Sequence, residues 1–377
     1  MPTRLPRSGS GEPATVVHVV PGPDGHGVTR HALSLLTRGS LAHHDILRVS
    51  DLRATSGDAP EGPEGRAEVV AQRLAAPAAA LLHLHVTDHL YAGSAGECAL
   101  VVEALAQGRR VGLTLHDLPS PGDGPGRYER RRAAYAAMAR AAAVVIVASH
   151  HEERLLREAL QAEGLEPGGE VHVVPLPLEP PTLPPSSTLP EPRHGHQRDI
   201  VVFGFLYPGK GHVPAIDALV GPPPLPADTG VTALGAVSPG HEYLVGELTA
   251  RAAALGRRFT VTGHVPDDEL VARLRSAALP AAPHEHVSAS GSIGSWFTAG
   301  RRPLAPVGDY VDELESRCPG AVLRYGPGTP FANLTEAARA ALDDAALTWL
   351  GPEVDLHPTP DEAAAEYARI LDAVAVR

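Results

Sequence analysis

Short apolar runs alternate with longer segments of helical periodicity along the first half of the chain. The apolar runs predict buried strands at Val16–Val20, Leu81–Val86, Val111–His116 and Val144–Ala148. Apolar residues spaced three and four apart predict helices between them, at Val28–Leu36, Ala99–Gln107, Arg127–Ala142 and Glu152–Ala159. Such alternation is typical of a parallel sheet with helices on both faces.

A proline-rich segment then interrupts the pattern. After one more expected strand, Val171–Leu176, residues 179–197 contain too much proline for a packed helix or strand, and we interpret them as a semi-rigid linker. The pattern restarts with expected strands at Ile200–Phe205, Val231–Leu234, Phe259–Val261, Leu279–Ala282 and Leu304–Ala305. Helices are expected at Glu242–Leu255, Asp267–Ser276 and Ser292–Ala299, with a final amphipathic helix at Pro360–Val376.

The sequence therefore predicts an α/β protein with two domains. We expect a disordered N-terminus over residues 1–13 and an N-terminal domain over 14–178. After the linker 179–197, a C-terminal domain covers 198–355, and the last helix lies within 356–377. The length of 377 residues suits two domains of this size.

Composition narrows the possible functions. Apolar residues make up 43% of the chain and charged residues 20%, which is enough for a packed core. The formal net charge of -12 argues against nucleic acid as the main partner. The only two cysteines, Cys98 and Cys318, lie far apart, so we expect no disulfide framework and a cytoplasmic location. We also expect neither a signal peptide nor stable membrane insertion.

A glycine-rich turn separates the first expected strand from the first expected helix. The backbone N–H groups at such a helix start suit an anion. Gly25 and Gly27 match the first two glycines of the dinucleotide-binding pattern G-x-G-x-x-G. The pattern is incomplete, because Arg30 occupies the position of its third glycine. We interpret this turn either as an anion site or as a tight strand-to-helix connection.

Two features of the second half suit a phosphate. Lys210 lies in a short loop between a strand and a helix, where its ammonium could meet a phosphate. Hydroxyl and backbone N–H groups also gather at the start of an apolar helix, at Ser288, Ser290, Gly291 and Ser292. A solvated lysine and a serine N-cap are the ordinary explanations of these features. Together the two features favour a diphosphate site.

Seven segments, in this order and spacing, resemble the retaining family-4 glycosyltransferases. They are GHGVTRH, TLHDLP, VVIVASHHEERLL, VVPLPL, FGFLYPGKG, VTGHVPDDELVARLRSA and AGRRPLAP, and they span nearly the whole chain. The resemblance implies the GT-B fold, in which two Rossmann-like α/β/α domains face each other across a cleft. It also implies that the N-terminal domain binds the acceptor, that the C-terminal domain binds a nucleotide-sugar, and that the last helix crosses back to the first domain.

The resemblance implies roles for individual residues. Gly27, with Gly25 beside it, would approach the donor, His116 would face the donor hexose, and Lys210 would pair with the leaving diphosphate. The nucleotide base would be contacted through the backbone of Gly263, His264 and Val265.

The sequence also departs from the family pattern. Phe205, after Gly204, stands near the place of the arginine that usually accompanies the lysine. Glu285 stands in for the first of the family's two glutamates, whereas Ser295 falls near the second. The expected donor site therefore includes Gly204, Phe205, Glu285 and the serine cluster.

The chemistry implied by the resemblance is transfer of a sugar from a nucleoside-diphosphate sugar to an acceptor, with retention of configuration. Lys210 and the donors at Ser290–Ser292 would stabilise the charge of the departing diphosphate. This route needs no carboxylate nucleophile, no metal and no other cofactor. Asp117, beside His116, is a candidate general base, although a carboxylate that caps its loop is the more common explanation.

Two other classes of function remain open. Three His-x-His pairs, His83/His85, His194/His196 and His284/His286, have the spacing of metal ligands along a strand and would suit a metal-dependent hydrolase. Histidines satisfied within a core or cleft are the commoner explanation. The departures at the glutamate positions would also suit a non-catalytic module that binds a sugar nucleotide.

The acceptor is expected to be a small polar molecule, either a secondary metabolite or a soluble glycan, and the protein a monomer or homodimer. The acceptor-side segments Leu52–Arg66 and Pro119–Arg131 are polar and rich in glycine and proline, so we expect them to be mobile. These segments lack the apolar or basic surface helix that a lipid-linked acceptor would need. The one basic stretch, RYERRRAAYAAMAR, could touch anionic lipid, but a solvated helix face is the expected role.

Overall fold

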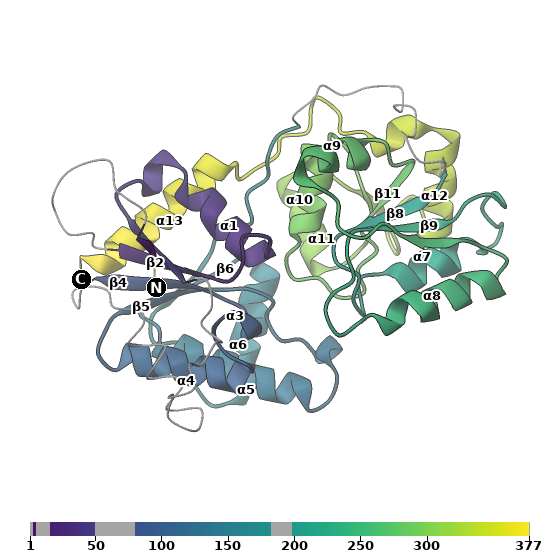
Figure 1. The fold of residues 1–377 in the computed structure, drawn as a ribbon. Coiled ribbons are helices and arrows are strands. Elements are labelled where there is room, and N and C mark those ends of the chain that lie inside the picture. Colours follow the sequence, from purple (N-terminus) through teal and green to yellow (C-terminus); the bar gives the residue numbers. More distant parts are fainter. Residues whose placement is uncertain (1–2, 5–15, 50–79, 182–197, 377) are drawn as a thin grey trace. The chain divides into compact units, whose positions relative to one another are not determined.

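The computed structural model describes residues 3–4, 16–49, 80–181 and 198–376. The chain divides into two compact units, each with its own sheet (Figure 1). The first unit comprises Met1–Pro177 together with Pro360–Arg377, and the second comprises Leu178–Thr359. The last helix therefore belongs to the first unit.

The first unit is built on a seven-stranded sheet in the order β1-β3-β2-β4-β5-β6-β7. Neighbouring strands are parallel except β1 and β3, which pair antiparallel. The strands are β1 Thr3–Arg4, β2 Val16–Pro21, β3 Asp45–Val49, β4 Leu81–Val86, β5 Val111–Leu115, β6 Val144–Val147 and β7 Glu170–Val173.

Alternation along the strands divides the core of the first unit between the two faces of the sheet. Val17 and Val19 of β2 pack with α4, α5 and α6, whereas Val16 and Val20 pack with α1 and α13. Figure 1 shows α1 and α13 together on one side of the strands. The helices are α1 Gly27–Leu36, η1 Gly39–Leu41, α3 Asp88–Tyr91, α4 Ala95–Ala106, η2 Pro121–Asp123, α5 Arg127–Ala141, α6 His150–Ala162 and α13 Pro360–Ala375.

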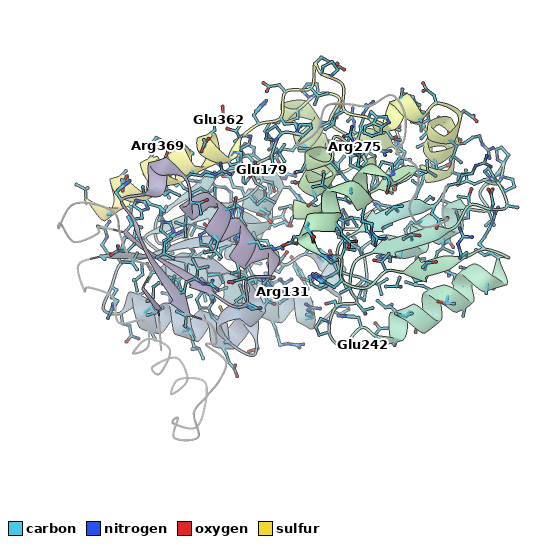
Figure 2. The ribbon with its side chains drawn as sticks, turned by 45° about the horizontal axis from the view of Figure 1, so that its top comes forward. Arg131, Glu179, Glu242, Arg275, Glu362 and Arg369 are labelled. Carbon is cyan, nitrogen blue, oxygen red and sulfur yellow. The ribbon has the colours of Figure 1, made fainter. Side chains whose placement is uncertain are left out.

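The final helix is amphipathic, as its sequence predicts. Tyr367, Ile370 and Leu371 are buried against the sheet and α1. Glu362 and Arg369 are exposed on the outer side of the helix (Figure 2). Helix α13 thus completes one face of the first unit, although it is remote from that unit in sequence.

The second unit has a six-stranded, fully parallel sheet in the order β10-β9-β8-β11-β12-β13. Its strands are β8 Ile200–Phe203, β9 Val231–Leu234, β10 Phe259–Val261, β11 Leu279–Ala281, β12 Leu304–Pro306 and β13 Leu323–Tyr325. Helices α7, α8 and α12 pack on one cluster of core residues, and α9, α10 and α11 pack on two others. The helices are α7 His212–Ala218, α8 Tyr243–Ala254, α9 Asp267–Arg275, α10 Gly291–Thr298, α11 Asp309–Arg317, α12 Leu334–Asp343 and η3 Ala345–Thr348.

Most predicted elements are present, and the differences have local causes. Helix α6 begins at His150, two residues before the expected start, because Ser149 caps it by accepting a hydrogen bond from the Glu152 N–H. Strands β1, β3 and β13 were not predicted. Strand β1 lies in the stretch expected to be disordered, whereas the rest of residues 1–13 lies outside the described residues, as do 182–197 of the expected linker and the segment Leu52–Arg66.

The segment Pro119–Arg131, expected to be mobile, is instead structured. It contains η2, in which the Ser120 N–H donates to Asp123, and the first turn of α5. None of the helices among the described residues is long and apolar enough to span a membrane.

Candidate functional site

The second unit brings the two expected anion-binding features together. Lys210 lies in the loop between β8 and α7 and is only 5% exposed. Its Nζ donates a 2.9 Å hydrogen bond to Oγ of Ser292, the second residue of α10. Ser290 is the N-cap of α10, and its Oγ lies 3.0 Å from that of Ser292. The amine and two hydroxyls therefore meet at the N-terminus of an eight-residue helix.

Close backbone packing holds the lysine loop against the loop that follows β11. The Glu285 N–H donates a 3.0 Å hydrogen bond to the Gly209 carbonyl. Gly211 has a φ of +95°, and a Cβ placed on it would lie 2.0 Å from the Pro283 carbonyl oxygen. Only glycine fits at this position, so the approach of the two loops is built into the sequence.

The electrostatics of this site favour an anion. Burial lowers the pKa of Lys210 to about 7. Burial also lowers the pKa of His212 to about 3 and that of His284 well below its usual value, with the Lys210 charge adding to both effects. Among the described residues, no carboxylate forms an ion pair with Lys210. Buried basic groups without a counter-ion would gain from a bound anion.

The lysine content of the chain is a signal that could have singled out this site from the sequence. Lys210 is the only lysine in the chain, and all the other residues among its 32 lysines and arginines are arginines. An arginine is always charged, whereas a lysine can lose its proton when buried. The choice of lysine at this one position points to a chemical requirement.

The other predicted donor-site residues differ in their exposure and in how close they lie to Lys210. Gly204 lies beside the lysine, since a Cβ placed on it would be 3.1 Å from Nζ. Phe205 is 49% exposed, and Glu285 is also exposed. Ser288 and Gly291 flank the Ser290 cap in the sequence. Gly263, His264 and Val265 follow β10, two strands away from β8, with His264 exposed and Val265 buried in the core.

In the first unit, the glycine-rich turn joins β2 to α1. His26 caps the helix, because its Nδ1 accepts a 3.3 Å hydrogen bond from the Val28 N–H. Gly25 and Gly27 are exposed and lack a positive φ, and a Cβ placed on either would meet no atom within 4 Å. Gly22, by contrast, has a φ of +80° and packs against Leu90. Packing and backbone conformation therefore require glycine at position 22 but not at 25 or 27.

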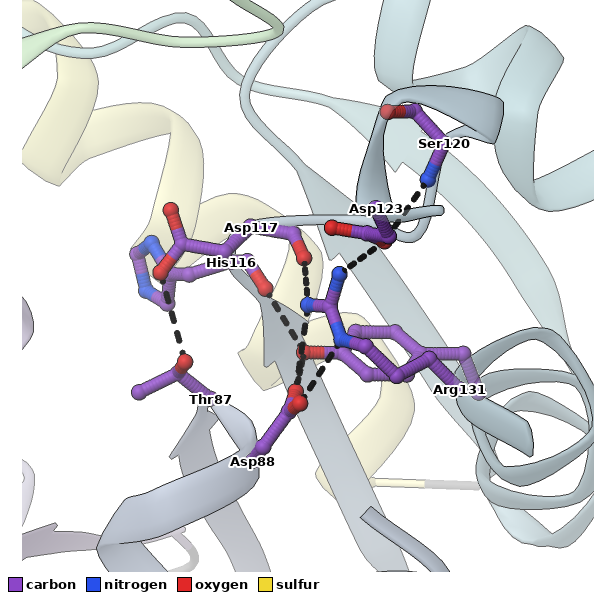
Figure 3. Close-up of polar contacts among 8 residues, drawn as sticks. Thr87, Asp88, His116, Asp117, Ser120, Asp123 and Arg131 are labelled. Atoms are coloured by element: carbon purple, nitrogen blue, oxygen red, sulfur yellow. Dashed lines mark hydrogen bonds and ion pairs between the residues drawn. The ribbon is translucent and has the colours of Figure 1, made fainter. Parts of the chain in front are cut away.

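His116 and Asp117 lie directly after β5, near the N-terminus of α3 (Figure 3). The buried His116 accepts a 3.0 Å hydrogen bond at its carbonyl from the Tyr135 hydroxyl. Asp117 is exposed, with a φ of +53°, and its carboxylate accepts a hydrogen bond from Thr87. The backbone of Asp117 is thus held in an unusual conformation.

A buried arginine supports that conformation, contrary to the expected solvated face. Arg131 of α5 contacts Asp88 at 2.7 Å and Asp123 at 2.5 Å, and donates to the Asp117 carbonyl at 2.5 Å (Figure 3). Burial opposes its charge, but the hydrogen bonds with Asp88, together with the charges of Tyr135, Asp88 and Asp123, outweigh this and raise the pKa of Arg131. The sequence does not indicate this role, because Arg131 stands between two other arginines, Arg130 and Arg132.

A chain of hydrogen bonds runs through buried histidines on the α1 and α13 side of the sheet. Asp372 of α13 contacts His44 Nε2 at 2.9 Å, His44 Nδ1 contacts His18 Nε2 at 2.9 Å, and His18 Nδ1 contacts His83 Nδ1 at 2.9 Å. His83 Nε2 then contacts the Thr114 hydroxyl at 3.0 Å. An ionised carboxylate only accepts, so each neutral ring donates towards Asp372.

Three groups of side chains in the described residues could hold a metal ion. They are His18, His83 and His85; His31, His85 and His116; and His43, His44 and Asp372. His18 and His83 already use both ring nitrogens in the chain of hydrogen bonds. In the second group, His31 Nε2, His85 Nδ1 and His116 Nε2 are buried and have no hydrogen-bond partner among the described residues.

The other histidine pairs of the sequence give less support to a metal site. His284 is buried, whereas His286 is exposed. His194 and His196 lie outside the described residues. Burial lowers the pKa of His31 and of His83 to about 3 and that of His116 to about 4, so these rings are neutral at pH 7.

No family model and no curated protein matches the sequence. Solved structures do match. Anabaena HepE in complex with UDP and glucose has a TM-score of 0.65 at 16% identity, over 96% of this chain and 97% of HepE. Sucrose-phosphate synthase from Thermosynechococcus elongatus has a TM-score of 0.59 at 16% identity, over 96% of each chain.

A third similar structure is that of the E. coli trehalose-6-phosphate protein bound with UDP-2-fluoro glucose. It has a TM-score of 0.58 at 11% identity, over 96% of this chain and 95% of its own. The likeness extends over nearly the whole length of all three proteins and includes both sheets. The chain therefore has the two-domain α/β architecture of the GT-B fold.

Proposed function

We propose that the protein is a glycosyltransferase. It transfers a sugar, which we expect to be a hexose, from a nucleoside-diphosphate sugar to a small polar acceptor. The second unit binds the nucleotide-sugar and the first unit binds the acceptor, a secondary metabolite or a soluble glycan. The reaction retains the anomeric configuration and needs no metal at the diphosphate. The protein works in the cytoplasm as a monomer or homodimer, and its two free, buried cysteines are consistent with reducing conditions.

The observation that carries this proposal is the contact of Lys210 with Ser292 at the start of α10. Departure of a nucleoside diphosphate concentrates negative charge on its terminal phosphate. The Lys210 ammonium, the hydroxyls of Ser290 and Ser292, and the first N–H groups of α10 would stabilise that charge. Stabilisation that grows as the bond breaks lowers the reaction barrier.

The similar solved structures support a nucleotide-sugar as the ligand. HepE has been solved in complex with UDP-glucose, and the E. coli protein is bound with UDP-2-fluoro glucose. The open space around Gly25 and Gly27 is consistent with a ligand that approaches the backbone of the first unit, since neither packing nor backbone conformation explains these glycines.

In the first unit, His116 faces the transferred hexose in our proposal. The diphosphate oxygen that leaves the sugar takes the proton of the acceptor hydroxyl, so no carboxylate nucleophile is needed. Asp117 is the alternative base, because its exposed carboxylate follows His116 directly. Arg131 holds the Asp117 carbonyl and acts as a positioning residue.

A binding module without turnover is the second candidate. Glu285 is exposed and forms no ion pair with Lys210, and Ser295, at the place of the second glutamate, donates its hydroxyl hydrogen bond to the Gly291 carbonyl within its own helix. Detection of a glycosylated product, or of the free sugar released from the donor by water, would exclude this candidate.

The proposal is tested by thermal stabilisation of the purified protein with UDP-, GDP-, dTDP- and ADP-sugars, beside zinc, manganese and NAD. A ligand of the folded state at about 100 times its Kd adds about 2.7 kcal/mol to the free energy of unfolding. We expect one nucleotide-sugar class to raise the Tm of the wild type and of Ser276→Ala, but not of Lys210→Met. Stabilisation by zinc or manganese, with none by any sugar nucleotide, would overturn the proposal in favour of the histidine groups.

A further inference from the structure

The Lys210 amine is surrounded by groups that do not compensate its charge. Its hydrogen-bond partner is the neutral Ser292 hydroxyl, and the Tyr207 ring centroid lies 5.8 Å from Nζ. Its titratable neighbours are two more bases, His212 at the start of α7 and His284 after β11, and the Lys210 charge lowers the pKa of both. Glu285 of the same loop is exposed, and no described carboxylate pairs with Nζ.

The buried Arg301 of the second unit has more hydrogen-bond acceptors around it than Lys210 has. Arg301 is fully buried, and it donates to the carbonyls of Thr348, Arg275 and Ala278. Arg275 donates to the Ala299 carbonyl. Backbone oxygens therefore surround Arg301, and burial lowers its pKa only to about 9, so its guanidinium stays charged at neutral pH. Lys210, by contrast, donates to a single hydroxyl, that of Ser292. It is also the only lysine in the chain.

We propose that above neutral pH the Lys210 amine is mostly neutral in the empty site and takes up a proton when a nucleoside diphosphate binds. This inference rests on the proposed function, since it concerns the same site. The amine accepts one proton from solvent and becomes an ammonium, which pairs with the entering diphosphate. Donor binding is therefore coupled to proton uptake and weakens as the pH rises above neutrality.

The direction of the pH dependence follows from the two states of the amine. Burial lowers the pKa of Lys210 to about 7 in the empty site, and a neighbouring phosphate anion raises it. The affinity for the diphosphate is therefore greatest below the Lys210 pKa of the empty site. It falls as the pH rises from that value towards the higher Lys210 pKa of the complex. Between the two pKa values, coupling to one proton raises Kd about tenfold per pH unit.

The coupling is measured by titrating the protein with UDP at pH 8, by calorimetry in Tris and in HEPES. The UDP phosphate, with a second pKa of about 6, is already ionised there and takes up no proton itself. The two buffers release protons with different enthalpies, so the difference in observed binding heat counts the protons taken up. We expect about nine-tenths of a proton per UDP, because about nine-tenths of an amine of pKa 7 is neutral at pH 8. GDP and ADP are used in the same way if UDP does not bind.

Lys210→Arg is the decisive variant, because its guanidinium is charged before the ligand arrives. It is expected to bind UDP with an affinity that changes little between pH 7 and 9, and with proton uptake reduced by about one. His284→Asn leaves the lysine in place and is expected to retain the uptake. The pH dependence of the wild type tests the inference by itself if Lys210→Arg does not fold.

Two results would contradict the inference in different ways. Tight UDP binding by the wild type with equal heats in Tris and HEPES would overturn the inference and leave the proposed function standing. Failure of UDP, GDP and ADP all to bind would overturn the proposed function, and this inference with it.

Discussion

The Nζ of Lys210 lies 2.9 Å from the Ser292 Oγ, which joins the loop after β8 to the first turn of α10. The contact unites two features that sit far apart in the sequence, a single lysine and a serine-rich helix start. It also sets where a diphosphate would bind in the second unit. Removing either partner should therefore weaken donor binding without disturbing the core.

The Ser292→Ala substitution tests the hydroxyl. In the donor complex, where the Lys210 amine is charged, it removes a hydrogen bond to a charged group, which is worth about 1.5–3 kcal/mol. We expect the Kd for the stabilising nucleotide-sugar to rise about tenfold to a hundredfold, measured by calorimetry. Ser276→Ala, at the end of α9, removes a hydroxyl that donates to the Arg273 carbonyl and should leave Kd unchanged. Equal effects of the two substitutions would argue against a ligand at the α10 terminus.

Substitutions of glycines in the loop between β2 and α1 should distinguish a role in ligand binding from a role in folding. Gly27 begins α1 and has open space around it, so Gly27→Ala should preserve the Tm or raise it, since alanine stabilises a helix by about 0.5–1 kcal/mol over glycine. If a donor approaches this backbone, its Kd should rise at least about tenfold, or ~1.4 kcal/mol.

Gly22→Ala is the matched comparison in the same loop. Its φ of +80° is strained for alanine, and the added Cβ would lie 2.7 Å from a Leu90 methyl carbon. We expect a fall in Tm before any ligand is added. A Gly27→Ala protein that is both stable and fully able to bind would show that no ligand approaches this turn.

Arg131 should matter for stability and for the geometry of Asp117. Arg131→Met leaves the buried Asp88 carboxylate without its cation, which costs about 3–5 kcal/mol in comparable buried pairs. Urea unfolding should show this loss, and activity should fall further in the fraction that stays folded. Arg132→Met removes the neighbouring, more exposed partner of Glu163 and should have a far smaller effect on the urea midpoint. A stable Arg131→Met protein would contradict the role assigned to this arginine.

The buried histidines predict an acid-sensitive first unit. Burial, with the charges of neighbouring histidines, lowers the pKa of His18, His31, His83, His85 and His116 below the unfolded value near 6.5. The unfolded chain then binds more protons below pH 6.5, so stability is complete above that pH and is lost as the pH falls. Each histidine contributes a slope of up to about 1.4 kcal/mol per pH unit.

Urea unfolding between pH 5 and 7.5 measures that slope. His31→Asn should reduce it by about one proton, since His31 Nε2 is buried without a partner among the described residues. His150→Asn, at an exposed position on α6, should leave the slope unchanged. A free energy of unfolding that does not vary over this range would show that the histidines bind protons equally in the folded and unfolded states, which would contradict their burial as neutral rings.

Much of the fold could be predicted from the sequence, because its strongest signals are local. Leu81–Val86, Val231–Leu234 and Phe259–Val261 have the bounds predicted for them, since each is a short run of mainly apolar and β-branched residues. Strand β3 was missed because Asp45 and Arg48 interrupt its apolar character, and β13 because Arg324 stands at its centre. Helix starts shifted where a capping serine came earlier than the apolar pattern did.

The candidate site could be predicted only in part. Lys210 and the serine cluster could each be recognised as suited to an anion, but their contact depends on two loops held together at Gly211. The chain from Asp372 to Thr114 joins side chains of several elements, and no spacing in the sequence indicates it. Arg131 was missed for the same reason, since its partners lie in other segments.

The most direct test of the central claim uses the fact that Lys210 is the only lysine. Protein labelled with 13C at the lysine ε-carbon should give one lysine resonance in the NMR spectrum, which reports on this site without further assignment. Titration with the stabilising nucleotide-sugar should shift that resonance until one equivalent is bound. A nucleotide-sugar that stabilises the protein yet leaves the lysine resonance unmoved would show that the diphosphate does not bind at Lys210.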